Sequence, residues 1–262
     1  MLIKGSYHPS APVHLVLSHC SQDPSSRALL LSPSRNALKD ALIEFNDDWI
    51  NCHGGEGRTC GCASRVNMLY PPKPAHLTLL LSMLHEYDGT VHHAKTTLDI
   101  APTLVVLHEL SSYFSQETSE HTVASYMSLI CHAMALVSSW SAQSATSSAL
   151  AVFDSGLDQL KLPVFRPFSP GDPGEDEVTA KREPVALFVE QYFEWIGTAE
   201  ELEAAAPSTS FDTSSLSDIE PRRMKTMRLR LLRRARRSRD EIIWNWSETF
   251  VGAGLARTVF LW

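Results

Sequence analysis

Short apolar runs bounded by proline or serine alternate along this chain with segments whose apolar residues recur every three or four positions. Such runs are typical of buried parallel strands, whereas the longer recurrence indicates amphipathic helices. The expected strands are Val13–Leu17, Ala28–Leu31, Val66–Tyr70, Thr103–Leu107, Ala149–Phe153 and Phe193–Gly197. The expected helices are Arg35–Ile50, a segment opened by Pro74, Thr118–Ser139 and Val185–Tyr192. Strands that alternate with helices predict an α/β layered domain.

Polar segments separate these elements. We expect loops at Asn51–Ser64 and Gly89–Ala101, and a Ser/Ala/Thr-rich connector at Ser138–Ser148. Residues 167–177 and 200–220 are acidic and rich in small residues, which predicts solvated, disordered inserts. With 262 residues, of which 44% are apolar, the chain is long enough for one or two domains. A single domain over residues 1–262 with two inserts fits this pattern best.

The C-terminal part has a different periodicity. Met227–Leu231 alternates apolar and basic residues, and Ile242–Trp246 is rich in β-branched and aromatic residues. The pair predicts an antiparallel β-hairpin with Arg233–Arg239 at its tip. A helix over residues 224–235 remains open as the alternative, because apolar residues also recur there at helical spacing.

Charge is unevenly distributed. The chain carries 23 Lys and Arg against 30 Asp and Glu, a net charge of -7, yet Arg222–Arg239 contains nine arginines, one lysine and no acidic residue. Such a run is compatible with nuclear import, with DNA contact and with a solvated surface. Arginine binds phosphate bidentately, and Trp244 and Trp246 are candidate stacking platforms for bases, although two tryptophans on one face are more often core. The candidate nucleic-acid-binding residues are Arg228, Arg230, Arg233, Arg234, Arg236, Arg237 and Arg239.

Cysteine usage favours a reducing compartment, because the five cysteines are an odd number and the chain does not start like a signal peptide. We expect no membrane contact, on the ground that no apolar run approaches the roughly 18 uncharged residues of a membrane helix. Cys52, His53, Cys60 and Cys62 place four soft donors within eleven residues. Their spacing departs from that of zinc motifs, so a mobile loop is favoured and a zinc-dependent interaction module is kept as an alternative.

The run Leu104–Leu107 is the kind of strand that carries an acidic metal ligand in nucleotide-hydrolysing folds, but no phosphate loop accompanies it. Such a loop cradles phosphates with backbone N–H groups and a Gly-Lys pair. Residues 1–50 contain one glycine, Gly5, and no Gly-Lys pair occurs in the chain. The ten residues Ser18–Arg27, between the first two expected strands, are too few for a phosphate loop and a crossover helix. We therefore expect no nucleotide cofactor and no catalytic residues.

Several short phrases occur in an order that resembles a known family. They are Leu29–Arg35, Val66–Pro72, Pro102–Phe114 and Val185–Phe193. Over about residues 13–247 the chain resembles the RecA-type ATPase partner of the SWIM-domain protein in the Shu complex, a recombinase-paralogue group. The resemblance implies a RecA-like, P-loop NTPase-type layered sheet, here without its phosphate loop. It also implies a nuclear protein that binds a SWIM-domain subunit, and through it the recombinase filament, in homologous recombination and DNA repair.

One departure from that family bears on the chemistry. The strand that usually ends in a magnesium-binding Asp is followed here by His108 and Glu109. Imidazole is a poor ligand for Mg²⁺, which prefers oxygen. The favoured interpretation is a non-catalytic subunit in which Glu109 caps a helix or serves an interface. The rival is an ATPase with an unconventional site and Glu109 as general base.

Overall fold

The structure is a computed structural model and describes residues 1–90, 93–115, 121–143, 147–165, 181–202, 222–234, 240–251 and 254–261. Its central sheet is built, within these residues, from β1 (Leu2–Gly5), β2 (Ala28–Leu31), β3 (Val66–Leu69), β6 (Leu104–His108), β7 (Ala149–Asp154), β10 (Trp195–Leu202), β11 (Arg222–Arg233), β12 (Glu241–Val251) and β13 (Gly254–Leu261). The strands lie in the order β13-β12-β11-β10-β1-β7-β6-β2-β3. The chain therefore has a mixed α/β fold.

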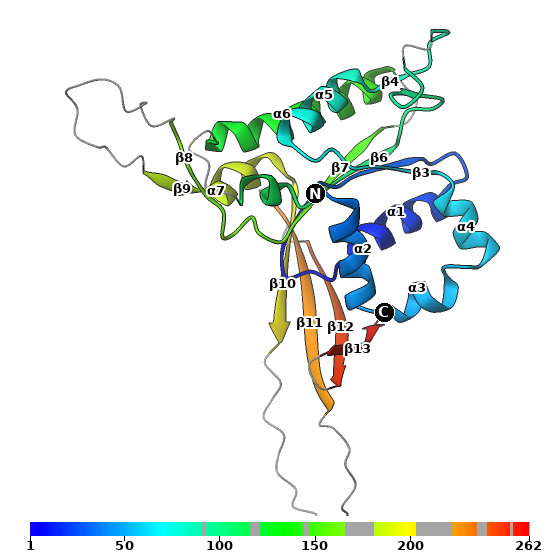
Figure 1. Cartoon of the computed structure of the whole chain (residues 1–262), viewed down its shortest axis with the longest axis vertical. Coiled ribbons are helices and arrows are strands. Elements are labelled where there is room, and N and C mark those ends of the chain that lie inside the picture. The colour runs from blue at the N-terminus through cyan, green and yellow to red at the C-terminus, as the bar shows by residue number, and fades with distance from the viewer. Residues whose placement is uncertain are drawn as a thin grey trace, which may run out of the picture.

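The sheet has a parallel part and an antiparallel part. Every neighbouring pair from β10 to β3 is parallel, and β10 to β13 pair antiparallel. Two short pairs lie outside this sheet: β4 (His85–Glu86) with β5 (Thr97–Leu98), and β8 (Lys161–Pro163) with β9 (Arg182–Pro184). In Figure 1 the antiparallel strands extend downward from the body of the molecule.

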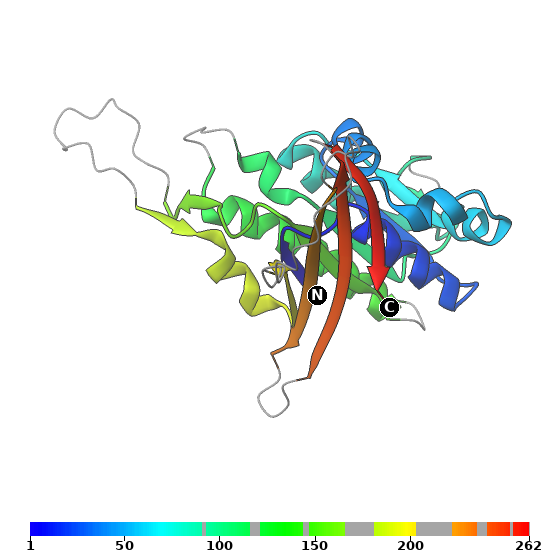
Figure 2. The same ribbon diagram turned by 90° about the horizontal axis from the view of Figure 1, so that it is seen from below.

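Helices cover both faces of the parallel part (Figures 1 and 2). On one face lie α1 (Ala11–Gln22), α2 (Arg35–Glu44), α3 (Asp48–His53) and α4 (Gly57–Ala63), and on the other lie α5 (Pro74–Met83), α6 (Val123–Gln143) and α7 (Val185–Val189). Alternate residues of β2 point to opposite cores: Leu29 and Leu31 pack with α5 and α6, while Ala28 and Leu30 pack with α1. Because such a strand is buried on both faces of the sheet, its sequence is a continuous apolar run.

The first expected strand was wrong. Val13–Leu17 lies inside α1, where Val16 and Cys20 are buried four positions apart against the sheet. Pro12 stands in the first turn, where a missing N–H and a fixed φ favour a helix start. Packing on the sheet outweighs the β preference of the valines. The strand that precedes α1 is β1. Residues 18–27 therefore do not have to hold a crossover helix, and the argument that they are too few for a phosphate loop and such a helix fails.

Other boundaries also differ from expectation. The helix expected over Arg35–Ile50 is interrupted, because Asn46 has φ +40° and Asp47 caps a new helix, α3. The expected loop Asn51–Ser64 contains the end of α3 and all of α4. The strands at Ala28–Leu31, Val66–Tyr70, Thr103–Leu107 and Ala149–Phe153 are confirmed to within one residue.

In the C-terminal part, β11 and β12 pair antiparallel, with Leu229 opposite Trp244, so the helical alternative for residues 224–235 was wrong where the structure describes it. The expected tip residues 235–239 lie outside the described residues. So does the expected insert 167–177, and of the insert 200–220 only Glu200–Leu202 are described, as the end of β10. The single-domain assignment remains a prediction.

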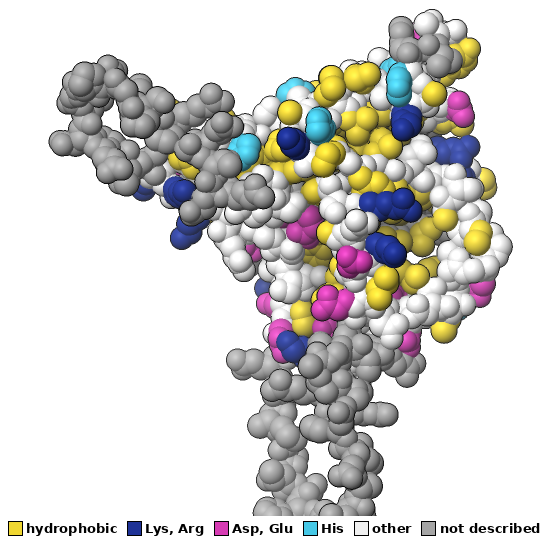
Figure 3. Space-filling view, in the orientation of Figure 1, with side chains coloured by type: hydrophobic (Ala, Val, Ile, Leu, Met, Phe, Trp, Pro, Cys, Tyr) yellow, Lys and Arg dark blue, Asp and Glu magenta, His cyan; other side chains and the backbone are white. Residues whose placement is uncertain are grey.

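The expectation about long uncharged runs was also wrong. α6 has 21 residues, none of them Asp, Glu, Lys or Arg, and is long and apolar enough to cross a membrane. One side of α6 is nevertheless buried in the protein core, through residues that include Tyr126, Ile130 and Trp140. Figure 3, in which α5 and α6 lie at the top, shows hydrophobic side chains and histidines over this layer.

Candidate functional site at the carboxyl ends of the parallel strands

The loop between β1 and α1 leaves the carboxyl end of a central parallel strand, which is where ligands bind in open α/β sheets. A strand, a short loop and a helix N-terminus are also the elements of phosphate sites. Gly5 turns the chain with φ +82°, and a Cβ there would lie 2.7 Å from the carbonyl oxygen of Ala199. The loop geometry therefore requires glycine at this position.

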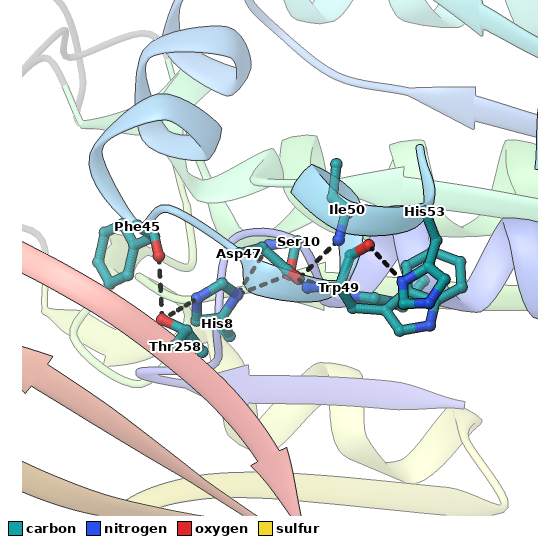
Figure 4. Close-up of polar contacts among 9 residues, drawn as sticks. His8, Ser10, Phe45, Asp47, Trp49, Ile50, His53 and Thr258 are labelled. Atoms are coloured by element: carbon teal, nitrogen blue, oxygen red, sulfur yellow. Dashed lines mark hydrogen bonds and ion pairs between the residues drawn. The ribbon is translucent and has the colours of Figure 1, made fainter. Parts of the chain in front are cut away.

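The side chains of this loop are engaged by the protein itself (Figure 4). The hydroxyl of Ser10, the N-cap residue of α1, donates to Oδ2 of Asp47, and His14 Nε2 lies 2.6 Å from the same oxygen. His8 Nδ1 lies 2.6 Å from Ser10 Oγ. His8, Ser10 and Asp47 are all at least 97% buried. The first turn of α1 is thus held against the connection between α2 and α3.

Asp47 is a persistent negative charge beside this helix start. Its Oδ1 accepts from the backbone N–H groups of Trp49 at 2.9 Å and Ile50 at 3.1 Å, which caps α3. Burial alone would raise the pKa of Asp47, but the hydrogen bonds from His14, Ser10 and Ile50 outweigh it and lower the pKa to about 2. Burial lowers the pKa of His8 to about 4, in spite of the nearby Asp47, so His8 is neutral at pH 7.

Strand β13 joins the same cluster. The hydroxyl of Thr258, fully buried, donates to the carbonyl oxygen of Phe45 at 2.9 Å and lies 3.1 Å from His8 Nε2. Figure 4 shows Thr258 on the strand that runs beside the loop. His8 and Thr258 are 250 positions apart in the sequence, and their contact closes this end of the loop between β1 and α1.

A second cluster lies where β6 and β7 end. Glu109 has φ +54°, and its carboxylate accepts hydrogen bonds from the Tyr7 hydroxyl, from the Ser155 hydroxyl at 2.8 Å and from the Ser155 N–H at 3.2 Å. Its side chain does not cap the short helix η1 (Leu110–Phe114). Glu109 thus binds the β1–α1 loop to the end of β7, a role that neither sequence interpretation included.

His108 occupies the last position of β6 and is buried. Its Nδ1 lies 3.1 Å from Ser32 Oγ, and its Nε2 lies 3.9 Å from a carboxylate oxygen of Glu109. Burial lowers the pKa of His108, although Glu109 acts in the opposite direction. A buried neutral imidazole stands where the family resemblance implies a magnesium-binding carboxylate.

Asp154, at the end of β7, was missed by the sequence analysis. It is fully buried and accepts from the Ser111 N–H at 2.9 Å, the Ser111 hydroxyl and the Tyr126 hydroxyl at 2.6 Å. Burial raises its pKa to about 6, although the hydrogen bonds from Ser111 and Tyr126 oppose the shift. An acidic residue directly after the apolar run Ala149–Phe153 was the signal that could have revealed it.

The proposed DNA-binding arginines that the structure describes lie on β11 or directly after it. Arg230 pairs with Glu241, and Arg233 pairs with Glu194 at 2.6 Å and with Asp240 at 3.4 Å. Carboxylates at these distances partly neutralise both guanidinium groups. Arg228 binds the side-chain oxygen of Asn245 at 3.4 Å, and the exposed Arg234 follows β11. Three further candidates lie outside the described residues: Arg236, Arg237 and Arg239.

The two candidate stacking tryptophans differ. Trp246 is 3% exposed and packs in the core, while Trp244, on the same face of β12, is 39% exposed. The indole N–H of Trp246 donates to Glu248 at 2.8 Å. Only Trp244 therefore offers an accessible ring.

The four candidate zinc donors are divided between two helices and engaged separately. His53 Nδ1 lies 3.1 Å from the Trp49 carbonyl, Cys60 Sγ contacts the Gly54 carbonyl at 3.6 Å, and Cys62 is buried. Among the described residues, no group of three or more His, Cys, Asp or Glu side chains is arranged to hold a metal ion.

Comparison with known proteins adds a distant structural likeness. No family model and no curated protein matched this chain. A solved structure of a DnaB-like replicative helicase, described with its interactions with primase, is similar with a TM-score of 0.42 and 10% sequence identity. The match covers 100% of this chain and 58% of the helicase chain. The chain thus spans less than two thirds of that protein, and the likeness carries no argument about activity.

Proposed function

We propose that this chain is a non-catalytic, RecA-like subunit of a Shu-type recombination mediator complex. It assists homologous recombination and DNA repair by binding a SWIM-domain partner subunit, with single-stranded DNA as a second ligand. The order of phrases from Leu29 to Phe193 supports the family assignment. One structural observation supports the non-catalytic part: the loop at the N-terminus of α1 is filled by its own side chains and faces a carboxylate.

The physical reason concerns charge. A phosphate loop surrounds the nucleotide with N–H donors and a lysine. Here the N-cap hydroxyl of α1, from Ser10, donates to Asp47, whose lowered pKa keeps it ionised at pH 7. A phosphate bound at the N-terminus of α1 would be repelled by the negatively charged Asp47. Near a protein surface, two unit charges of the same sign about 4 Å apart repel each other by about 4 kcal/mol. The geometry therefore disfavours a triphosphate at this loop.

A titration of the purified chain with magnesium-ATP tests this part. We expect no heat of binding and no rise in melting temperature at millimolar nucleotide, and no phosphate release. Binding with a micromolar dissociation constant would raise the free energy of unfolding by several kcal/mol at that concentration. Such binding, together with turnover abolished by Glu109→Gln, would overturn the proposal in favour of the rival ATPase.

The partner assignment is tested separately, by co-expression of the tagged chain with a SWIM-domain subunit. We expect the two to co-elute at a fixed ratio in size-exclusion chromatography. Failure to co-elute would remove the Shu-type assignment while leaving the conclusion about nucleotide binding unaffected.

A further inference from the structure

Two of the five cysteines are buried on helices that pack against each other. Cys20 lies near the end of α1 and is fully buried, and Cys62 lies near the end of α4 and is 5% exposed. Both side chains belong to the core between the sheet and α1, which includes Val16. The Cα atoms of α1 and α4 approach within 8 Å, and the two helices lie side by side in Figure 1. The fold thus brings two distant thiols into one cluster.

The charges around Cys20 show that each thiol lies within electrostatic reach of the other. Burial raises the pKa of Cys20, the guanidinium group of Arg65 opposes this shift, and a negative charge on Cys62 adds to it. Such effects weaken with distance, so they act between neighbouring groups. Because its pKa is raised, the thiol of Cys20 is protonated at neutral pH.

Arg65 lies between the two helices and contacts the second thiol. Its Nη2 lies 3.6 Å from Cys62 Sγ, its Nε donates to the Gly61 carbonyl at 3.3 Å, and its Nη1 donates to the Asp23 carbonyl, just beyond α1, at 2.8 Å. A cation in contact with a sulfur atom stabilises the thiolate, which is the form that attacks oxidants. Cys62, the more accessible of the two cysteines, is therefore favoured as the attacking thiol.

We propose that Cys20 and Cys62 form an oxidisable dithiol, which a hydroperoxide converts into a disulfide between α1 and α4. The Cys62 thiolate attacks one oxygen of hydrogen peroxide: an S–O bond forms, the O–O bond breaks, and the leaving hydroxide takes up a proton to give water. The Cys20 sulfur then attacks the sulfenic acid on Cys62, and the second oxygen leaves as water with the Cys20 proton. Both thiols are oxidised and the peroxide is reduced to water. The inference is independent of the proposed function.

The composition of α4 allows the small movement that a disulfide needs. A disulfide holds its two Cβ atoms about 3.8 Å apart. α4 has seven residues, which include Gly57 and Gly61, and its N-cap residue, Glu56, makes no side-chain hydrogen bond to the helix. Glycine within a helix and the lack of a cap both weaken it. This short helix can therefore adjust against the longer α1.

The experiment is peptide mapping of the full chain after treatment with hydrogen peroxide, with the remaining thiols alkylated. Trypsin releases Cys20 in residues 5–27, and Cys62 together with Cys60 in residues 59–65. We expect the two peptides to be joined in the parent chain and also in Cys60→Ser, the matched control, where Cys62 is the remaining thiol of its peptide. Cys20→Ala and Cys62→Ala should each abolish the joined product.

Stability and rate are two further readouts. A disulfide between two packed helices stabilises a protein, so oxidised Cys60→Ser should melt roughly 5–10 °C higher than the reduced form, and dithiothreitol should reverse the shift. Arg65→Gln should slow formation of the disulfide about threefold or more relative to Arg65→Lys, which keeps the positive charge. Arg58→Gln removes an exposed charge from the same helix and should leave the rate unchanged.

Circular dichroism of the reduced proteins establishes which variants fold. Cys60 is exposed, so Cys60→Ser keeps the test decisive even where a buried cysteine cannot be replaced. Oxidation confined to the exposed Cys52 and Cys60, with Cys20 and Cys62 alkylated only after unfolding, would overturn the proposal. A bond from Cys20 to Cys60, lost in Cys60→Ser, would overturn it as well.

Discussion

The hydroxyl of Tyr126, on α6, donates a hydrogen bond of 2.6 Å to Oδ2 of Asp154, at the end of β7, and both residues are fully buried. The bond joins the outer helical layer to the carboxyl end of the sheet. Because burial raises the pKa of Asp154 to about 6, this acid changes its charge close to neutral pH. The stability of the protein is therefore linked to pH at this point.

The sign of that linkage follows from the direction of the shift. A carboxyl whose pKa rises from 3.8 to about 6 on folding contributes stability that is present below pH 3.8 and lost as the pH rises through about 6. At about 1.4 kcal/mol per pKa unit, Asp154 alone removes about 3 kcal/mol from the free energy of unfolding over this window. Asp47, whose pKa is lowered, acts in the opposite direction in acid.

We expect Tyr126→Phe to lower the free energy of unfolding by about 1.5–3 kcal/mol at pH 8, where its hydroxyl binds an ionised Asp154, and by clearly less at pH 5. Urea unfolding at the two pH values measures the difference. Tyr113→Phe is the control, since the Tyr113 hydroxyl donates at 2.5 Å to the Pro71 carbonyl and its loss should not depend on pH over this range. Equal losses for Tyr126→Phe at both pH values would contradict the assignment.

Asp47 has the opposite linkage. Its pKa falls from 3.8 to about 2, so the stability it contributes is present above pH 3.8 and lost as the pH falls through about 2. We expect Asp47→Asn to lower the free energy of unfolding at pH 7 by about 2 kcal/mol, because the amide cannot accept from Ser10 and His14 at the former Oδ2. The variant should also lose less stability than the parent between pH 4 and pH 2.

Chemical denaturation across this pH range is the measurement. The control is Asp40→Asn on the exposed side of α2, which removes the same charge and should change stability by less than about 0.5 kcal/mol. A loss in Asp40→Asn as large as that in Asp47→Asn would show that net charge, and not the Asp47 cluster, is responsible.

The arginine segment leads to a prediction about DNA. If it grips single-stranded DNA, log affinity falls with log salt at about -0.7 per phosphate contact. Arg230 and Arg233 already pair with carboxylates, so we expect Arg230→Ala with Arg233→Ala to change the slope little. Replacing Arg234, Arg236 and Arg237 with Ala should make the slope less steep by about 2. Fluorescence anisotropy of labelled oligo-dT over a salt series measures the slope for both variants. A larger change of slope in Arg230→Ala with Arg233→Ala than in the three-residue variant would contradict this division.

The same segment is tested as an import signal. We expect a fluorescent fusion of the parent chain in the nucleus, and a fusion with Arg233, Arg234, Arg236 and Arg237 replaced by Ala in the cytoplasm. Arg228→Ala with Arg230→Ala is the matched control, which leaves Arg233, Arg234, Arg236 and Arg237 in place. Unchanged location and unchanged DNA affinity in the four-residue variant would leave the segment as a solvated surface.

The sequence by itself determined the elements whose signal is local. Apolar runs such as Ala28–Leu31 and Leu104–Leu107 are buried on both sides of a parallel sheet and therefore stand out without any knowledge of the fold. The amphipathic spacing of α5 and α6 and the basic run around Arg233 are likewise visible in short windows. Periodicity and charge are properties of neighbouring residues, so they can be recognised from neighbours alone.

The tertiary structure decided what depends on distant residues. Val13–Leu17 has the composition of a strand, but packing on the sheet makes it part of α1. Tyr7 and Glu109 are 102 positions apart, and His8 and Thr258 are 250 apart, yet each pair is in contact. A buried polar group is stable only when its partners are supplied, and those partners come from whichever strand end the topology brings near. For that reason the self-filled loop at the start of α1 and the buried Asp154 were invisible until the strand order was known.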